Sequence, residues 1–169
     1  MTELVTGAAA LARTDPAAIA RLTDAATRST YYADWMGPAE HEAIRRIVDL
    51  AAPACAAAAN GPDGHLIAAF AGGAFAGFVI ATLHGPDDRE LDWLMVHPDY
   101  HGTGISGALM EAGMAWLGKD RPIWLTVLQH NSRALGFYRR FGFEVDPGTA
   151  LERSIPTCVM RRPPSIQHG

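Results

Sequence analysis

The chain has 169 residues, of which 49% are hydrophobic and 19% charged, and its formal net charge at pH 7 is −4. This length and composition indicate a single globular domain with its own core and exclude a disordered chain. The excess of acidic over basic residues disfavours general nucleic-acid binding. The sequence also lacks the cluster of basic residues that a membrane-binding patch would need. The cysteines Cys55 and Cys158 lie too far apart for a disulfide framework or a zinc motif, so no metal is expected.

The first residues lack the basic-then-apolar pattern of a signal peptide, so a cytoplasmic protein is expected. Residues 66–83 carry no formal charge and approach the length of a membrane-spanning helix. However, Gly72 and Gly73 divide this stretch into two halves of strand length. The pattern therefore favours a β-hairpin over 65–84 rather than a membrane span.

In chain order, residues 4–11 are a candidate edge strand, although their alanines favour strands little. A helix is expected over 16–28, and a second from about 38 to 59 that Pro53 should kink or end. Further strands are expected at 65–71, 74–84, 90–96, 122–129, 143–145 and 155–160, with helices at 103–117 and 131–141. This order predicts a mixed sheet with helices on its faces, in one domain over 1–162 followed by a loose tail over 163–169.

One segment carries most of the chemical information, and it reads Val96-His97-Pro98-Asp99-Tyr100-His101-Gly102-Thr103-Gly104-Ile105-Ser106-Gly107. A strand should end here, a glycine-bearing turn should follow, and a helix should begin. Unpaired N–H groups at a helix N-terminus, together with the helix dipole, favour a phosphate or pyrophosphate. Glycine lets such a ligand approach the backbone, because it has no Cβ.

Two other interpretations of this turn remain. Gly102-x-Gly104-x-x-Gly107 is also the dinucleotide-binding fingerprint, which requires an acidic residue at the end of the next strand. That strand ends in residues 129–131, Gln-His-Asn, without a carboxylate, and the turn follows a late strand rather than the first. The other interpretation is an ordinary glycine turn that binds no ligand.

The pattern Val96-x-Pro98-x-Tyr100-x-Gly102-x-Gly104-Ile105 resembles the acyl-CoA-binding segment of the GNAT superfamily, the acyl-CoA-dependent N-acyltransferases. Residues 131–143 are similar to a second segment of that family, Asn-x-x-Ala-x-x-x-Tyr-x-x-x-Gly-Phe. The resemblance implies an α/β (α+β) fold with a mixed, mostly antiparallel sheet of about six or seven strands and helices on both faces. In the phosphate loop, His101 replaces the family's Arg or Gln and Ser106 replaces a small residue.

The resemblance implies acetyl-CoA as the acyl donor and an amine, either a small molecule or a peptide, as the acceptor. Tyr138 matches the general acid that protonates the leaving thiolate, and Asn131 matches the residue that holds the pantetheine arm, although it could also simply cap a helix. The backbone N–H of Val96 is the implied oxyanion donor. The residues implied in acyl-CoA binding are Leu94, Met95, Val96, His101, Gly102, Thr103, Gly104, Ile105, Ser106, Gly107, Asn131, Ala134 and Tyr138.

Glu90 is the candidate general base, because some family members use a glutamate at the matching place. Strand alternation predicts one shared face for Glu90, Asp92, Leu94 and Val96. Repulsion between the two carboxylates would raise the pKa of one of them, which suits a base. Asp92, or a water molecule, remains an alternative base.

The acceptor site is expected near residues 29–35, where Tyr31, Tyr32 and Trp35 could hold a cationic amine together with the carboxylate of Asp34. Asp92 is a further candidate for contact with the acceptor. The alternative is that these aromatic side chains only pack the core. The predicted function is N-acetyl transfer by direct attack, without a covalent enzyme intermediate. A non-catalytic acyl-CoA-binding module, acting as a sensor or partner subunit, is the alternative; a homodimer is common in the family.

Overall fold

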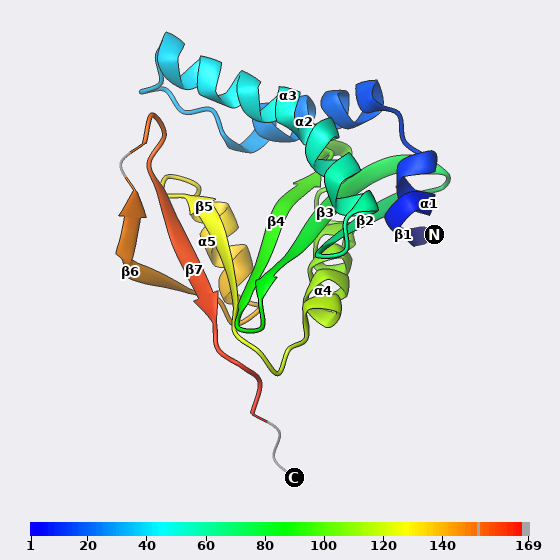
Figure 1. Ribbon diagram of the computed structural model, residues 1–169. Coiled ribbons are helices and arrows are strands. Elements are labelled where there is room, and N and C mark those ends of the chain that lie inside the picture. The colour runs from blue at the N-terminus through cyan, green and yellow to red at the C-terminus, as the bar shows by residue number, and fades with distance from the viewer. Residues whose placement is uncertain (152, 167–169) are drawn as a thin grey trace.

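A computed structural model describes residues 1–151 and 153–166 of the chain (Figure 1). It is built on a seven-stranded mixed sheet. The elements in chain order are β1 (Thr2–Thr6), α1 (Gly7–Ala12), α2 (Pro16–Thr30), α3 (Pro38–Asn60), β2 (Gly64–Ala71), β3 (Ala74–Gly85), β4 (Asp88–Val96), the 3-10 helix η1 (Pro98–Tyr100), α4 (Ile105–Leu117), β5 (Ile123–Leu128), α5 (Ser132–Arg139), β6 (Glu144–Leu151) and β7 (Thr157–Arg162).

The strands lie in the order β1-β2-β3-β4-β5-β7-β6. All neighbouring strands are antiparallel except β4 and β5, which are parallel. The paired residues of β4 and β5 are Glu90 and Trp124, and beyond this point the two strands diverge (Figure 1). The sheet therefore has an opening between its two middle strands, and this opening positions the site.

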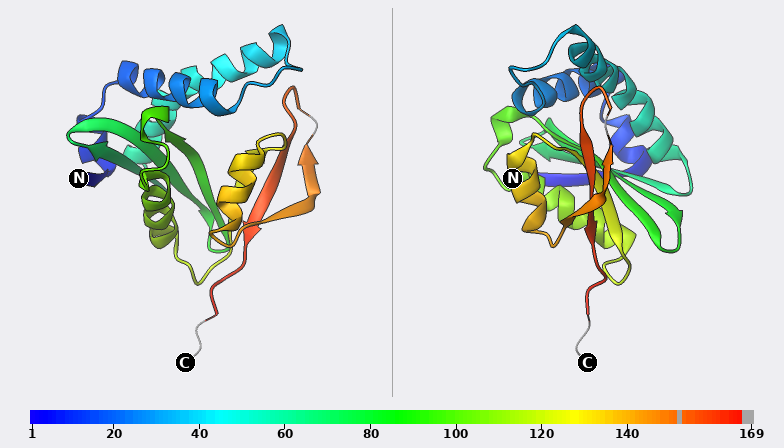
Figure 2. Two further views of the ribbon diagram at one scale, coloured as in Figure 1. Left: turned by 180° about the vertical axis from the view of Figure 1, so that it is seen from behind. Right: turned by 90° about the vertical axis from the view of Figure 1, so that its left-hand side faces the viewer.

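Helices cover both faces of the sheet, which confirms the predicted fold class (Figures 1 and 2). Alternating side chains of β2 divide between two apolar cores. Ile67 and Ala69 pack in the core of α4, to which α5 also contributes. Leu66, Ala68 and Phe70 pack in the core of α1, α2 and α3. Because both faces of the central strands are buried, β2 and β3 read in the sequence as a nearly continuous apolar run.

The hairpin predicted over 65–84 is formed by β2 and β3. Its turn lies at Gly72 and Gly73, whose φ angles of 56° and 85° are the left-handed values that glycine tolerates best. No helix within the described residues is both long and apolar enough to cross a membrane.

Three of the predicted elements differ from the structure by more than small shifts at their ends. The strand expected over 143–145 is longer, because β6 continues to Leu151. The strand expected over 4–11 is wrong in its second half, because β1 ends at Thr6 and the alanine-rich stretch that follows forms α1. Helix α3 does not end at Pro53 but continues to Asn60. Pro53 lies on the exposed side of α3, where water can solvate the carbonyl that loses its partner, while buried Ala51 and Cys55 hold the helix on the core.

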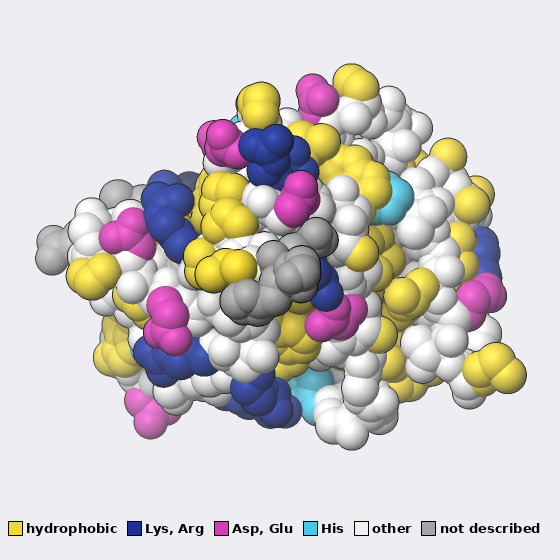
Figure 3. All heavy atoms as spheres, turned by 90° about the horizontal axis from the view of Figure 1, so that it is seen from below, with side chains coloured by type: hydrophobic (Ala, Val, Ile, Leu, Met, Phe, Trp, Pro, Cys, Tyr) yellow, Lys and Arg dark blue, Asp and Glu magenta, His cyan; other side chains and the backbone are white. Residues whose placement is uncertain are grey.

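The chain end is only partly described. Of the tail expected over 163–169, residues 163–166 have no regular secondary structure, and residues 167–169 lie outside the described part of the chain. The N–H of Ser165 donates a hydrogen bond of 2.7 Å to the carbonyl of Lys119. On the face that Figure 3 shows, Lys and Arg side chains lie among Asp and Glu. Surface pairs such as Arg161 with Asp146, at 2.8 Å, agree with this mixture of charges.

A β-bulge interrupts β4 beside the opening. Ile80 of β3 pairs with Asp92, and Phe78 pairs with Met95, so β4 contains one residue more than β3 between these pairs. Trp93 lies within the bulge and has a φ of 56°, which is unusual for a bulky side chain. The bulge changes which face of the sheet the following residues reach.

The predicted common face of Glu90, Asp92, Leu94 and Val96 is therefore wrong. Asp92 lies opposite Ile80, which belongs to the core under α1, α2 and α3, and Glu90 shares this face. Leu94 and Val96 instead pack in the core of α4. The extra residue of the bulge reverses the alternation of side chains between the two faces of the sheet. Glu90 and Asp92 therefore face one side, and Leu94 and Val96 face the other.

Candidate active site

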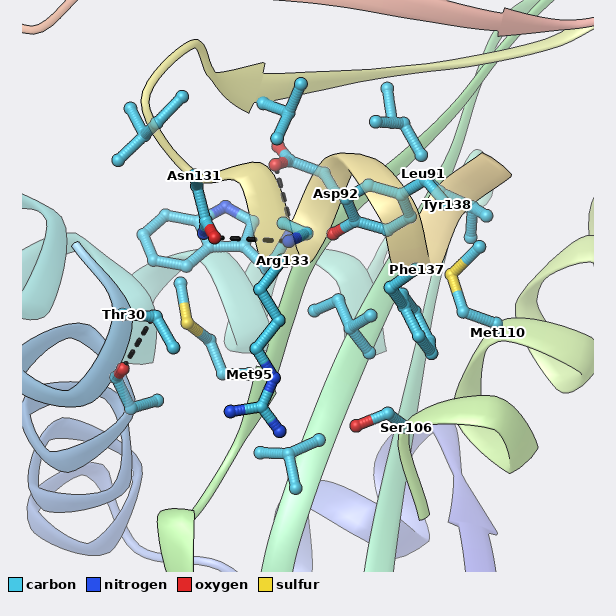
Figure 4. Close-up of a pocket in the computed structure, with 18 of the residues that line it drawn as sticks. Thr30, Leu91, Asp92, Met95, Ser106, Met110, Asn131, Arg133, Phe137 and Tyr138 are labelled. Atoms are coloured by element: carbon cyan, nitrogen blue, oxygen red, sulfur yellow. Dashed lines mark hydrogen bonds between the residues drawn. The ribbon is translucent and has the colours of Figure 1, made fainter. Parts of the chain in front are cut away.

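A cavity of about 790 Å³ lies where β4 and β5 separate, and residues from both faces of the sheet line it (Figure 4). On the α4 side it is lined by Gly102, Gly104, Ser106, Met110, Phe137 and Phe141. On the α2 and α3 side it is lined by Ala26, Thr30, Tyr31, Ile47, Leu50 and Trp93. Because the lining comes from both faces, the cavity continues through the opening in the sheet. Two molecules could therefore meet inside it from opposite sides.

The turn before α4 has the geometry of an anion site. Gly102 and Gly104 have φ angles of 79° and 88°, and Gly104 is the N-cap of α4. The N–H of Ala108 makes the first hydrogen bond of the helix, to the carbonyl of Gly104 at 3.0 Å. The preceding N–H groups of α4 thus have no carbonyl acceptor within the helix, and they sit at its positive end. A phosphate group is the ligand that such donors favour.

The space in front of these glycines is open. A Cβ atom built on Gly102 or Gly104 would meet no described atom within 4 Å. An approaching pyrophosphate would occupy that space, and a side chain would compete with it for contact with the backbone. The residues present therefore fit the diphosphate part of an acyl-CoA.

We expect Gly104→Ala to weaken acetyl-CoA binding by about tenfold or more, since charge-assisted hydrogen bonds to the phosphates would be lost. The left-handed φ should also destabilise the fold by about 1–2 kcal/mol. Gly73→Ala is the matched control: its φ of 85° and its open surroundings are nearly the same, but it lies in the hairpin turn away from the cavity. Titration calorimetry and thermal unfolding measure both effects, and equal binding by the two variants would contradict an anion site at Gly104.

Two arginines, Arg133 of α5 and Arg140 at its C-terminal end, join this side of the cavity and were not predicted from the sequence. Arg133 and Arg140 both line the cavity (Figure 4 labels Arg133). Arg133, Phe137 and Arg140 are spaced i, i+4 and i+7, which places all three on the same side of α5 and its C-cap. This spacing is the sequence pattern from which the two arginines could have been predicted. Arg140 stacks on Phe137, 5.4 Å from the ring centre. Burial, with the nearby charge of Arg133, lowers the pKa of His101, which favours the neutral form of its ring.

Tyr138 and Asn131 lie at the junction of the two halves of the cavity, and both line it. Burial, with smaller contributions from Tyr31 and Asp92, raises the pKa of the Tyr138 hydroxyl well above its usual range. The phenol therefore remains protonated at neutral pH and can act as a proton donor. The side-chain oxygen of Asn131 accepts a hydrogen bond of 3.1 Å from the N–H of Ala134, so Asn131 also caps α5.

Asp92 enters the cavity from the opposite face. Figure 4 shows its carboxylate and the Tyr138 hydroxyl directed into the same part of the cavity. One carboxylate oxygen accepts a hydrogen bond of 2.8 Å from the N–H of Trp93. The carboxylate is open to water in the cavity, yet the protein around it raises its pKa by desolvation. Its charge also contributes to the raised pKa of Tyr31, about 12, for which burial is the main cause.

Glu90 lies beside the cavity rather than among the residues described as lining it. Its carboxylate is 2.9 Å from Nε2 of His84, and its side chain is 14% exposed. Burial raises the pKa of Glu90, while the hydrogen bond to His84 opposes this effect. The same hydrogen bond raises the pKa of His84. Glu90 therefore already has a partner, and Asp92 is the carboxylate that faces the cavity.

The backbone N–H of Val96 points into the opening. The next N–H, of His97, donates to the carbonyl of Ala76 on β3 at 2.9 Å. Successive N–H groups of a strand point to opposite sides, so the N–H of Val96 faces away from β3, toward the gap left by β5. This is the orientation that an oxyanion donor requires.

The aromatic cluster between α2 and α3 is divided in the structure. Tyr31 lines the cavity, whereas Tyr32 packs against His41, with ring centres 5.1 Å apart. Trp35 is 53% exposed and meets His130 edge-on at 5.7 Å. Tyr32 and Trp35 thus pack outside the described lining of the cavity.

The remaining residues predicted for the site can be placed in the same way. The residues that line the cavity are Tyr31, Asp92, Leu94, Met95, Val96, His101, Gly102, Gly104, Ser106, Gly107, Asn131, Ala134 and Tyr138. Thr103 and Ile105 are not described in the lining, because Thr103 bonds back to the carbonyl of Tyr100 and Ile105 is buried in the core. Within residues 1–151 and 153–166, no group of three or more His, Cys, Asp or Glu side chains is placed to hold a metal ion.

Curated proteins and solved structures are similar to parts or all of this chain. An uncharacterized N-acetyltransferase of Mycobacterium tuberculosis is 44% identical over 72 residues, which cover 39% of this chain and 45% of the relative; one of Mycobacterium bovis matches equally. The chain thus covers less than half the length of these relatives. The PaiA N-acetyltransferase of Thermoplasma acidophilum, solved with coenzyme A, is 20% identical with a TM-score of 0.76, over 96% of this chain and 99% of that one.

A second solved structure is the ribosomal-protein-S18-alanine N-acetyltransferase of Escherichia coli. It is 19% identical with a TM-score of 0.62, over 99% of this chain and 96% of that one. At this identity the two structures show a shared fold. The model of the acetyltransferase (GNAT) family matches residues 20–143, which is most of the chain. This protein therefore belongs to the acetyltransferase (GNAT) family.

Proposed function

We propose that this protein transfers an acetyl group from acetyl-CoA to a primary amine by direct attack of the amine on the thioester. One observation carries the proposal: a single cavity joins an anion-binding helix N-terminus on one face of the sheet to Asp92 on the other, with Tyr138 between them. The first half suits the diphosphate of coenzyme A, and the second suits an amine.

Acetyl-CoA would bind on the α4 side. The N–H groups at the start of α4, with Arg133 and Arg140 across the cavity, would hold its phosphates. The diverging β4 and β5 leave strand edges that can hold the amide-bearing arm, and Asn131 lies beside this path. The acetyl carbonyl would then accept a hydrogen bond from the N–H of Val96, which stabilises the negative charge that develops during attack.

The amine would enter from the α2 and α3 side as an ammonium ion and give one proton to Asp92, whose raised pKa suits a base. The free nitrogen then attacks the carbonyl carbon, a C–N bond forms, and the C–S bond breaks. Tyr138 donates its proton to the leaving thiolate and recovers one from the acetylated nitrogen, directly or through water. The products are the acetylated amine and coenzyme A.

The test combines binding and turnover. We expect purified protein to bind acetyl-CoA but not NAD in a calorimetric titration, and to release the coenzyme A thiol when primary amines are added. Binding of acetyl-CoA without turnover across a broad amine panel would instead identify a non-catalytic acyl-CoA-binding module. Absence of acetyl-CoA binding would contradict the proposal altogether.

A further inference from the structure

The charges around the cavity are distributed unequally between its two halves. The charged or titratable side chains described in its lining, apart from tyrosines, are Asp92, His101, Arg133 and Arg140. The last three lie on the α4 and α5 side, where phosphates would bind. The half under α2 and α3 therefore offers one carboxylate, Asp92.

Apart from the hydroxyls of Thr30 and Tyr31, the other side chains described on the α2 and α3 side of the cavity are apolar. Ile47 and Leu50 of α3 line it, and Leu50 is 57% exposed, although it is a large apolar side chain. Trp93 lines it as well, held there by the strained backbone of the bulge. Exposed apolar side chains around one carboxylate and a few neutral polar groups are typical of a site for a mostly apolar ligand.

A polycationic acceptor does not match this half. Each further ammonium group would lose part of its hydration against Ile47, Leu50 or Trp93, and that loss is costly. The described lining holds no second carboxylate, and Glu90, beside the cavity, is already paired with His84.

We propose that the acceptor is a primary monoamine with an apolar body, aromatic or branched alkyl. Its nitrogen lies at Asp92, and its body lies against Trp93, Ile47 and Leu50. This inference rests on the proposed function only in taking the α2 and α3 half as the acceptor side. Leu50 and Ile47 are then residues that determine which acceptors bind.

Amine binding to protein saturated with coenzyme A tests the inference separately from turnover. We expect phenethylamine to bind at least about tenfold more tightly than spermidine in a calorimetric titration, since desolvation of unpaired charges is unfavourable. Equal or tighter binding of spermidine would overturn the inference, and so would tighter binding of a tripeptide with a free N-terminus. Failure of every amine to bind would overturn it too, whereas amine binding without turnover would count against the proposed function alone.

A charge placed on the apolar wall gives a sharper test. Leu50→Glu should strengthen binding of 1,4-diaminobutane and weaken that of phenethylamine, each by about two- to fivefold, the range of an exposed ion pair. Leu4→Glu is the matched control, because Leu4 is also exposed, at 38%, but lies on β1 at the edge of the sheet. The same selectivity in both variants would overturn the assignment of Leu50.

Discussion

Tyr138→Phe is expected to lower kcat by about 10²–10⁴-fold while acetyl-CoA affinity changes little. The substitution removes the hydroxyl that protonates the leaving thiolate but keeps the ring, which packs against Phe137 and Phe143 at centre distances of 5.4 and 6.3 Å. The variant should therefore fold and bind the donor normally. Steady-state kinetics with a saturating amine, and calorimetry with acetyl-CoA, measure the two quantities.

Tyr32→Phe provides the control for this result. Tyr32 is another partly buried tyrosine, but it packs against His41 outside the described lining of the cavity. Removal of the Tyr32 hydroxyl should leave kcat nearly unchanged. An unchanged kcat in Tyr138→Phe would remove Tyr138 from the mechanism, and a parallel loss of acetyl-CoA affinity would mean that it acts in binding instead.

Asp92→Asn is expected to have an effect of similar size, lowering kcat/KM by about 10²–10⁴-fold, because an amide cannot accept the proton of the ammonium ion. The amide oxygen can still accept the hydrogen bond from the N–H of Trp93, so the bulge should persist. Since the fold raises the pKa of Asp92, the ionised carboxylate is disfavoured there, and a neutral amide should not lower the unfolding temperature.

Glu90→Gln distinguishes the two carboxylates. Glu90 is bonded to His84 and is not described in the lining of the cavity, so this variant should retain most of the activity of the unmodified protein. A large loss in Glu90→Gln, with little loss in Asp92→Asn, would assign the base to Glu90, acting through water across the intervening distance.

The pH dependence of activity follows from the same geometry. A general base acts in its ionised form, so kcat/KM should fall as the pH decreases through the pKa of Asp92. Because desolvation raises that pKa, the acidic limb should lie above the usual value for aspartate, about 3.9. Asp92→Asn should lose this limb, and a limb that persists in the variant would belong to another group.

Features that depend on a few adjacent residues were predictable from the sequence. The glycine turn before α4 could be identified because a left-handed backbone and an uncapped helix start are encoded locally by Gly102 and Gly104. The hairpin at Gly72 and Gly73 was predictable for the same reason. The family and the fold class followed from two such segments and the order of the elements, and both are confirmed by the family match and the seven-stranded sheet.

Features that depend on contacts between distant segments were decided by the tertiary structure alone. Alternation along β4 predicted one face for both carboxylates and Val96, but the bulge opposite β3 separates them, since its extra residue is defined only by pairing with another strand. The packing of β3, β4 and α5 likewise decides three further features. Asp92 faces the cavity, Glu90 pairs with His84, and Arg133 lines the cavity. Local sequence specified the glycine turn before α4, whereas packing decided which carboxylate faces the cavity, because a side chain's partner across a sheet is not encoded in its neighbours along the chain.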